Sequence, residues 1–244
     1  MSGRVGSITT PIISDGLVFN MDAANRASTI PSISTDKTFN TIDTAISGAF
    51  VNDTIYDSST ISPSYAFDGT GDYIDINNES YFDYNEFLTS ECWIYLNGTS
   101  RCSLISKGPG ASSAGGWMWD YGGFNSGQIE FVAIGGSSKY INIGTSLSVT
   151  AWHHVVATFD STLSGNSKLQ LYVDGEIVSS PTYTTSGTMS TILNNNYNVR
   201  IGARSDTGNI PLNGNIQSLR LYNRALSASE VLHNYNALKG RFGL

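Results

Sequence analysis

Residues 214–235 read GNIQSLRLYNRALSASEVLHNY, and this stretch decides the fold. Its first half carries the apolar residues of a β-strand, namely Ile216, Leu219, Leu221 and Tyr222. Ser227 and Glu230 then have the spacing of a capping box, in which a hydroxyl and a carboxylate satisfy backbone donors at a helix start. The apolar residues that follow recur at helical spacing: Val231, Leu232, Tyr235 and Leu238. Gly240 is expected to end the helix. The sequence therefore predicts a strand, a corner and one short helix.

The chain before this stretch reads as short strands and turns. Trp152 to Phe159 predicts a buried strand, and the AspGly pair at 174–175 predicts a two-residue hairpin, because these residues tolerate positive φ angles. Residues 65–76 predict a hairpin-like unit around Gly69 and Gly71. About a dozen short strands separated by Gly, Asn and Ser favour a sandwich or a barrel.

Length and charge exclude several classes of protein. The 244 residues show no composition break, which favours a single domain. Thirteen basic residues stand against 20 acidic ones, for a net charge of −7, so we expect no nucleic-acid partner. The first 16 residues lack the apolar core of a secretory signal. No apolar run approaches the ~20 residues that span a bilayer, so we expect no membrane insertion.

The two cysteines, Cys92 and Cys102, lie in stretches that predict neighbouring strands joined by a turn near Gly98. In that register Cys92 faces a residue near Ile105 and not Cys102, which argues against a disulfide. We therefore expect two reduced thiols, compatible with assembly in a reducing cytoplasm.

Six segments in order resemble the laminin G-like jelly-roll domains of the concanavalin A-like superfamily. They are AFDGTGDYI at 66–74, ECWIY at 91–95, AWHHVVATFD at 151–160, LYVDGEIV at 171–178, RIGAR at 200–204 and residues 214–231. The resemblance implies an all-β fold, a two-sheet antiparallel jelly-roll sandwich with one short C-terminal helix. We expect the sandwich to span residues 16–238, with an extended arm at 1–15 and a tail at 239–244 outside it.

A narrower likeness concerns the two ends of the sandwich. GLVFNMDAANR at 16–26 and YNALKGRFGL at 235–244 are similar to the termini of laminin G-like proteins encoded by tailed bacteriophages. This resemblance implies a non-enzymatic virion structural or decoration protein, assembled in the host cytoplasm. Its partners would be other virion proteins and copies of itself. The alternative is a lectin-like adhesin that binds bacterial surface polysaccharide, either with or without calcium.

Catalysis is not expected. Glucanases on this fold use two Glu and an Asp on one strand, where alternation places carboxylates on one face. The six Glu residues are scattered through the chain instead: Glu79, Glu86, Glu91, Glu130, Glu176 and Glu230. His153 and His154 point to opposite faces of one strand and cannot share a metal ion. No Ser-His-Asp or metal-ligand spacing is evident in the sequence.

A structural calcium ion is one site that the family resemblance implies. Calcium prefers carboxylate, carbonyl and amide oxygens at loop rims. The positions that correspond to the ligands of relatives are Asp22, Asp68 and Gln217, and a neutral amide at Gln217 should weaken binding. The alternative is that Asp68 and Asp72 only fix the tight turn around Gly69 and Gly71.

An aromatic row is the second candidate site. Trp117, Trp119 and Tyr121 alternate, so their rings should share one face of a strand. On an exposed face they could stack on sugar rings or contact a partner protein. Aromatic residues at this spacing are more often buried, and the alternative places the row in the core between the sheets.

Overall fold

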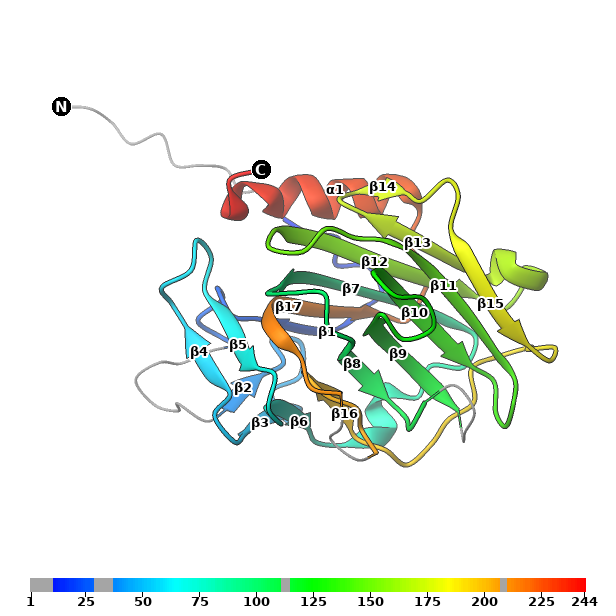
Figure 1. Ribbon diagram of the computed structural model, residues 1–244, viewed down its shortest axis with the longest axis horizontal. Helices are drawn as coiled ribbons and strands as arrows, with labels where there is room; N and C mark the ends of the chain where they lie inside the picture. Colours follow the sequence, from blue (N-terminus) through cyan, green and yellow to red (C-terminus); the bar gives the residue numbers. More distant parts are fainter. Residues whose placement is uncertain (1–10, 29–36, 111–114, 207–209) are drawn as a thin grey trace.

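The computed structural model describes residues 11–28, 37–110, 115–206 and 210–244. Two antiparallel sheets pack face to face, and one α-helix lies along the outside of one of them (Figure 1). This is the all-β sandwich that the sequence predicts. None of the helices in the described ranges is long and apolar enough to cross a membrane.

Sheet A has eight strands and carries the helix. Its order is β14-β13-β12-β7-β17-β5-β4, and β1 also pairs with β17. The strands are β1 (Leu17–Asp22), β4 (Ile55–Asp57), β5 (Ser64–Asp68), β7 (Phe87–Leu96), β12 (Trp152–Asp160), β13 (Leu169–Val173), β14 (Glu176–Ile177) and β17 (Asn213–Tyr222).

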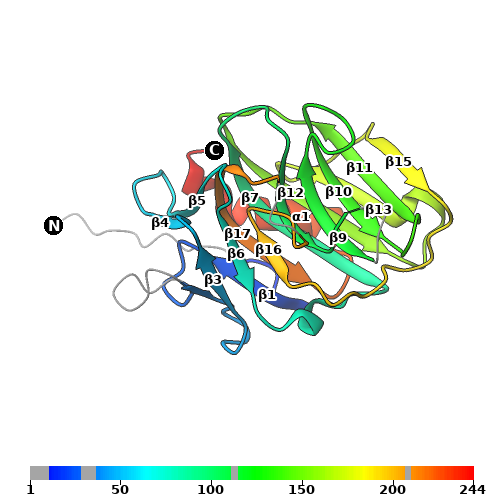
Figure 2. The same ribbon diagram turned by 60° about the horizontal axis from the view of Figure 1, so that its bottom comes forward.

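Sheet B has nine strands, in the order β15-β11-β10-β9-β8-β16-β6-β3-β2. The strands are β2 (Lys37–Phe39), β3 (Ser47–Val51), β6 (Tyr73–Ile76), β8 (Cys102–Lys107), β9 (Gly116–Tyr121), β10 (Gln128–Ile134), β11 (Tyr140–Ser146), β15 (Thr182–Ser186) and β16 (Val199–Ile201). Figure 2 shows β9, β10, β11 and β15 running side by side. Short 3-10 helices, η1 (Glu79–Phe82) and η2 (Gly165–Lys168), lie in the connections.

Strand alternation separates the core from the outer faces. Along β7, Cys92 and Ile94 belong to the main core, whereas Trp93 packs in a separate cluster with Leu238 and Phe242. Both faces of the long central strands are therefore buried. Sheet A achieves this because the helix covers its outer face.

The C-terminal helix α1 (Ala228–Leu238) begins as the sequence predicts. Ser227 Oγ accepts from the Glu230 N–H at 3.4 Å, and the Glu230 carboxylate accepts from the Ser227 N–H at 2.8 Å, which completes the capping box. Val231 packs on Val156 and Tyr222 of the sheet below. Figure 1 shows α1 lying along β12 and β13 on the side away from sheet B.

The predicted helix end is wrong by a few residues. The chain continues from α1 directly into a 3-10 helix, η3 (Lys239–Phe242), so Gly240 does not stop it, and the left-handed residue is Gly243. The sequence predicts a tail outside the sandwich here, whereas Phe242 is buried and stacks on Trp93 with ring centroids 4.0 Å apart. The last residues are therefore part of the packed structure.

Two predicted hairpins are also wrong. β5 and β6 are joined by the turn at Gly69–Gly71 but pair in different sheets, and so do β7 and β8. The connections cross between the layers because a jelly roll places successive strands in opposite sheets. Cys92 and Cys102 consequently lie in different sheets, and both are buried free thiols. The expectation of reduced thiols is confirmed, although the hairpin argument behind it is not.

Candidate functional site

The outer face of sheet A, beneath α1, carries charged residues that are almost completely buried. Glu91 on β7 stands directly opposite Arg220 on β17, and neither side chain is more than 1% exposed. Arg220 Nη1 donates to Glu91 Oε1 at 3.1 Å, and Nη2 donates to Asp22 Oδ2 at 2.9 Å. One guanidinium group is therefore shared by two carboxylates, one on each strand that flanks β17.

Asn234 ties the helix to this network. Its Nδ2 donates to Glu91 Oε2 at 2.6 Å and to the Tyr222 hydroxyl at 2.9 Å. Its Oδ1 accepts from the Ile13 N–H at 2.8 Å. A single buried amide thus joins the helix, the sheet and the segment that precedes β1.

The ionisation of the network follows from these contacts. Burial alone would raise the pKa of Glu91, but His154, Arg220 and Asn234 lower it to about 2. Burial would lower the pKa of Arg220, but the carboxylates of Glu91 and Asp22 raise it. Both groups are charged at neutral pH, because each charged form is stabilised by an oppositely charged partner within hydrogen-bonding distance.

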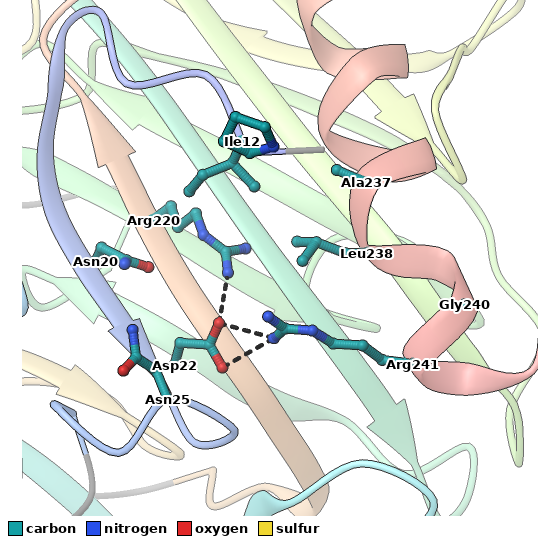
Figure 3. Close-up of a pocket in the computed structure, with 10 residues that line it drawn as sticks. Ile12, Asn20, Asp22, Asn25, Arg220, Ala237, Leu238, Gly240 and Arg241 are labelled. Atoms are coloured by element: carbon teal, nitrogen blue, oxygen red, sulfur yellow. Dashed lines mark hydrogen bonds and ion pairs between the residues drawn. The ribbon is translucent and has the colours of Figure 1, made fainter. Parts of the chain in front are cut away.

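A cavity of about 550 Å³ opens beside this network, between β1, β17 and the C-terminal segment. Figure 3 shows Arg220 and Arg241 reaching the Asp22 carboxylate from two sides. Arg241 Nη1 donates to both carboxylate oxygens, at 3.1 and 2.8 Å. The polar lining is Asn20, Asp22, Asn25, Arg220 and Arg241, and the apolar lining includes Pro11, Ile12, Ala237 and Leu238.

Two polar atoms of this lining lack partners among the described residues. Asn20 Oδ1 and Arg220 Nε are buried and make no hydrogen bond there. Buried polar groups are normally satisfied, by protein or by a bound molecule. The Arg241 side chain is 38% exposed, so its contact with Asp22 lies toward solvent and is the most easily displaced. The cavity therefore offers one accessible cation, Arg241, next to two enclosed polar atoms.

The three candidate calcium ligands do not form one site. Gln217 Nε2 donates to Asp22 Oδ1 at 2.6 Å, so these two residues do meet. Asp68 instead accepts from Thr70 N–H and hydroxyl in an exposed turn. Two guanidinium groups hold the Asp22 carboxylate, and they would repel a divalent cation. The donor set around Asp22 therefore does not fit calcium.

The aromatic row lies inside the molecule. Trp117 and Trp119 are 0% exposed and Tyr121 is 1% exposed, and all three belong to the main core. Trp119 Nε1 donates to Ser90 Oγ of the opposite sheet at 2.9 Å, which fixes the ring between the layers. The structure places the row where the core alternative puts it, and no ring face is open to a sugar.

Sheet B brings two carboxylates together that are well separated in the sequence. Asp120 on β9 stands opposite Glu130 on β10, and both are buried. Glu130 accepts from the N–H groups of Phe124 and Asn125, at 2.7 and 2.8 Å. Burial raises the pKa of Asp120. Gly123 lies over both carboxylates, so that a Cβ there would meet Glu130 Oε2 at 2.9 Å and Asp120 Oδ2 at 3.0 Å. The pair clamps a loop and has no access for a sugar substrate.

One group of hydrogen-bonded side chains is not predicted from the sequence. His153 Nε2 lies 2.8 Å from Ser148 Oγ, and its Nδ1 lies 2.9 Å from Asp174 Oδ2. The three residues come together at the rim of the sandwich because β12 pairs with β13. The predicted AspGly hairpin, which the structure confirms at Val173 and Glu176, was the only signal that could have placed Asp174 near β12.

Comparison with known proteins supports the architecture. Residues 68–232 match the family model Laminin_G_3, described as Concanavalin A-like lectin/glucanases superfamily. A search of curated protein sequences found no match. Among solved structures, the botulinum neurotoxin serotype D binding domain superposes with a TM-score of 0.65 at 15% identity, over 91% of this chain and 51% of that chain.

Two further solved structures share this fold. The binding domain of Paraclostridial Mosquitocidal Protein 1 gives a TM-score of 0.64 at 15% identity, over 91% of this chain and 52% of that one. A structure of botulinum neurotoxin type C, a toxin whose cell entry depends on interaction with two ganglioside molecules, gives a TM-score of 0.60 at 12% identity, over 91% of this chain and 51% of that one. The chain spans about half the length of these structures. Identities this low establish the shared fold alone.

Proposed function

Because the chain belongs to the laminin G-like family of the concanavalin A-like lectin/glucanases superfamily, we propose that it is a module that binds surface carbohydrate without cleaving glycosidic bonds. The observation that carries this proposal is the cavity beside Asp22. Its volume of about 550 Å³ lies in the range of small-molecule sites, which hold ~300–1,000 Å³.

The lining of the cavity suits a sugar ring. Sugar hydroxyls accept from guanidinium and amide N–H groups, and the exposed Arg241 and the half-buried Asn25 line the cavity. Ile12 and Leu238 provide an apolar wall for the carbon face of the ring. The wall is rigid because Arg220 and Glu91 lie paired behind it. The neighbouring toxin structures support this reading because they too are named as binding domains.

Direct binding to a panel of bacterial surface polysaccharides and glycolipid headgroups tests the proposal, with calcium and with a chelator. We expect saturable binding that chelation does not change, since the donor set around Asp22 does not fit calcium. Absence of binding from a folded protein would overturn the proposal.

Arg241→Ala locates the site. Removing the exposed guanidinium should weaken glycan binding about tenfold, the effect of losing one charged hydrogen bond. Lys239→Ala is the matched control: it removes the same charge from η3, but Lys239 lies over the Tyr235 ring and does not line the cavity. Equal losses in both variants would show that only the net charge matters.

A place in a virus particle is a second proposal. The two segments whose sequences are similar to phage proteins, residues 16–26 and 235–244, meet around this cavity, where Asp22 contacts Arg241. A host-recognition site on a particle would unite both readings. Proteomic detection of this chain in purified particles supports it, and consistent absence from them contradicts it.

A further inference from the structure

Three segments converge at the rim of the sandwich on a second potential site. Ser148 lies in the connection between β11 and β12, His153 is the second residue of β12, and Asp174 lies in the turn between β13 and β14. The hydrogen-bond chain runs from Ser148 Oγ to His153 Nε2 at 2.8 Å and from His153 Nδ1 to Asp174 Oδ2 at 2.9 Å. This is the atom order that activates a serine nucleophile.

Two hydrogen bonds to the backbone of His154 fix the position of Asp174. Its N–H donates to the His154 carbonyl at 2.8 Å, and its Oδ1 accepts from the His154 N–H at 2.9 Å. The turn itself is tight, with φ of 51° at Asp174 and 84° at Gly175. One carboxylate oxygen is thus used to anchor the side chain, and the other is left to face the imidazole ring.

The charge of Asp174 then sets the tautomer of His153. Burial alone would raise the pKa of Asp174, but hydrogen bonds from His153 and from the His154 N–H lower it. An ionised carboxylate can only accept, so His153 Nδ1 carries the proton. In the neutral ring, Nε2 then presents a lone pair to the Ser148 hydroxyl, as a general base must.

We propose that Ser148 and His153 form a catalytic pair, positioned by Asp174, that hydrolyses carboxylic esters. Ser148 Oγ attacks the ester carbonyl while its proton passes to His153 Nε2. The carbon–oxygen bond to the alcohol breaks, and the alcohol leaves with that proton. Water then attacks the acyl-serine, its proton passes through His153 to Ser148 Oγ, and the carboxylic acid is released. The activity goes beyond the proposed glycan binding and does not depend on it.

The surroundings leave the nucleophile open and shelter the base. Ser148 is exposed on the surface, and the His153 side chain is only 14% exposed, so the base is sheltered and the nucleophile is open. Within the described residues, the backbone N–H groups of Ser148 and Val149 make no hydrogen bond and remain available to an oxyanion. Thr150 holds a left-handed conformation, with φ of 61°, that β-branched residues avoid. Backbone strain of this kind is common at functional sites.

The test is acyl transfer to the purified protein. The protein is incubated with p-nitrophenyl acetate and with a fluorophosphonate probe, and the modified residue is located by peptide mass spectrometry. We expect labelling at Ser148 and release of p-nitrophenol at least tenfold above that of Ser148→Ala. The matched control is Ser146→Ala, which removes an exposed hydroxyl just before this loop and should change nothing.

Two further variants separate chemistry from folding. His153→Ala should lose the activity and regain part of it when imidazole is added, which a purely structural role would not allow. Asp174→Asn should lower the rate at least tenfold while the circular dichroism spectrum stays the same. Labelling at another residue, or a rate in Ser148→Ala equal to that of the unaltered chain, would overturn the proposal. So would a rate that is indifferent to His153.

Discussion

Two consecutive histidines lie in contrasting regions of this molecule. His154 is 0% exposed under α1, with Nε2 3.4 Å from Glu91 Oε1 and its ring packed beside Trp93. His153 points the other way, to the rim, where it contacts Ser148 and Asp174. Strand alternation alone separates them. Of these two residues with the same chemistry, His154 thus belongs to a buried ionic network, and His153 belongs to a hydrogen-bond chain at the solvent-facing rim.

The contrast shows what burial does to charged groups. Beneath α1 each charge has a fixed partner, so the network holds strands β1, β7 and β17 together and its removal should be costly. At the rim the Asp174 side chain is 34% exposed, so water can replace a lost partner there. We therefore expect changes beneath the helix to alter stability and changes at the rim to alter chemistry.

The largest effect should come from Arg220→Met. This variant leaves the Glu91 and Asp22 carboxylates buried without their shared cation, which costs about 3–5 kcal/mol. Chemical denaturation measures the loss of unfolding free energy. Arg224→Met is the control, because it breaks the partly exposed pair with Glu230 and should cost no more than about 1 kcal/mol. Similar losses of unfolding free energy in the two variants would mean that the buried network stabilises the protein no more than the partly exposed pair does.

Acid should destabilise the protein through the same network. The pKa of Glu91 falls from 4.5 to about 2 on folding. A lowered folded-state pKa stabilises the protein above the unfolded value, and this stability is lost as the pH falls from about 4.5 to about 2. The loss is on the order of 3 kcal/mol.

Unfolding curves of Glu91→Gln across this pH range check the assignment. The variant should be less stable at neutral pH and should lose less of its stability on acidification. Glu230→Gln removes a second carboxylate whose pKa is about 2, but this group is partly exposed and water screens it. An acid slope that Glu91→Gln leaves unchanged would assign the effect to other groups.

His154→Leu should have a smaller effect. The leucine fills most of the space beside Trp93, but Glu91 loses one of its positively polarised neighbours. We expect a cost of about 1–3 kcal/mol, the range for a disturbed buried polar contact. Thermal and chemical unfolding measure it, and a variant as stable as the parent chain would show that Arg220 and Asn234 suffice to hold Glu91.

The sequence predicts these two regions unequally because local and long-range patterns differ. The capping box at Ser227 and the turn at Asp174 depend on neighbouring residues, and the structure confirms both. The crossing of the chain between sheets at Gly69–Gly71 depends on partners far along the chain, so the hairpin prediction there is wrong. The prediction fails there because a tight turn has the same sequence pattern whether it joins strands of one sheet or strands of two sheets.

The candidate sites show the same limit. The family resemblance places Asp22 and Gln217 in one site, and they do meet. Arg220 and Arg241 decide what Asp22 can bind, but nothing in their quoted segments indicates that they meet it. The register of β1 on β17 and the path of the C-terminal segment bring them together. Ser148 and Asp174 are 26 positions apart in the chain, and only strand pairing brings both to His153.

The smallest effect on stability should come from His153→Gln. The glutamine retains hydrogen-bonding groups, and water reaches the partly exposed Asp174 carboxylate, so the unfolding free energy should change by no more than about 0.5 kcal/mol. Chemical denaturation beside His154→Leu makes the measurement. A loss for His153→Gln as large as that for its neighbour would mean that the rim chain is a structural clamp between the Ser148 loop and the Asp174 turn. A negligible loss would leave a serine, a histidine and an aspartate aligned at the surface with no structural need for the alignment, as expected of a site that serves chemistry.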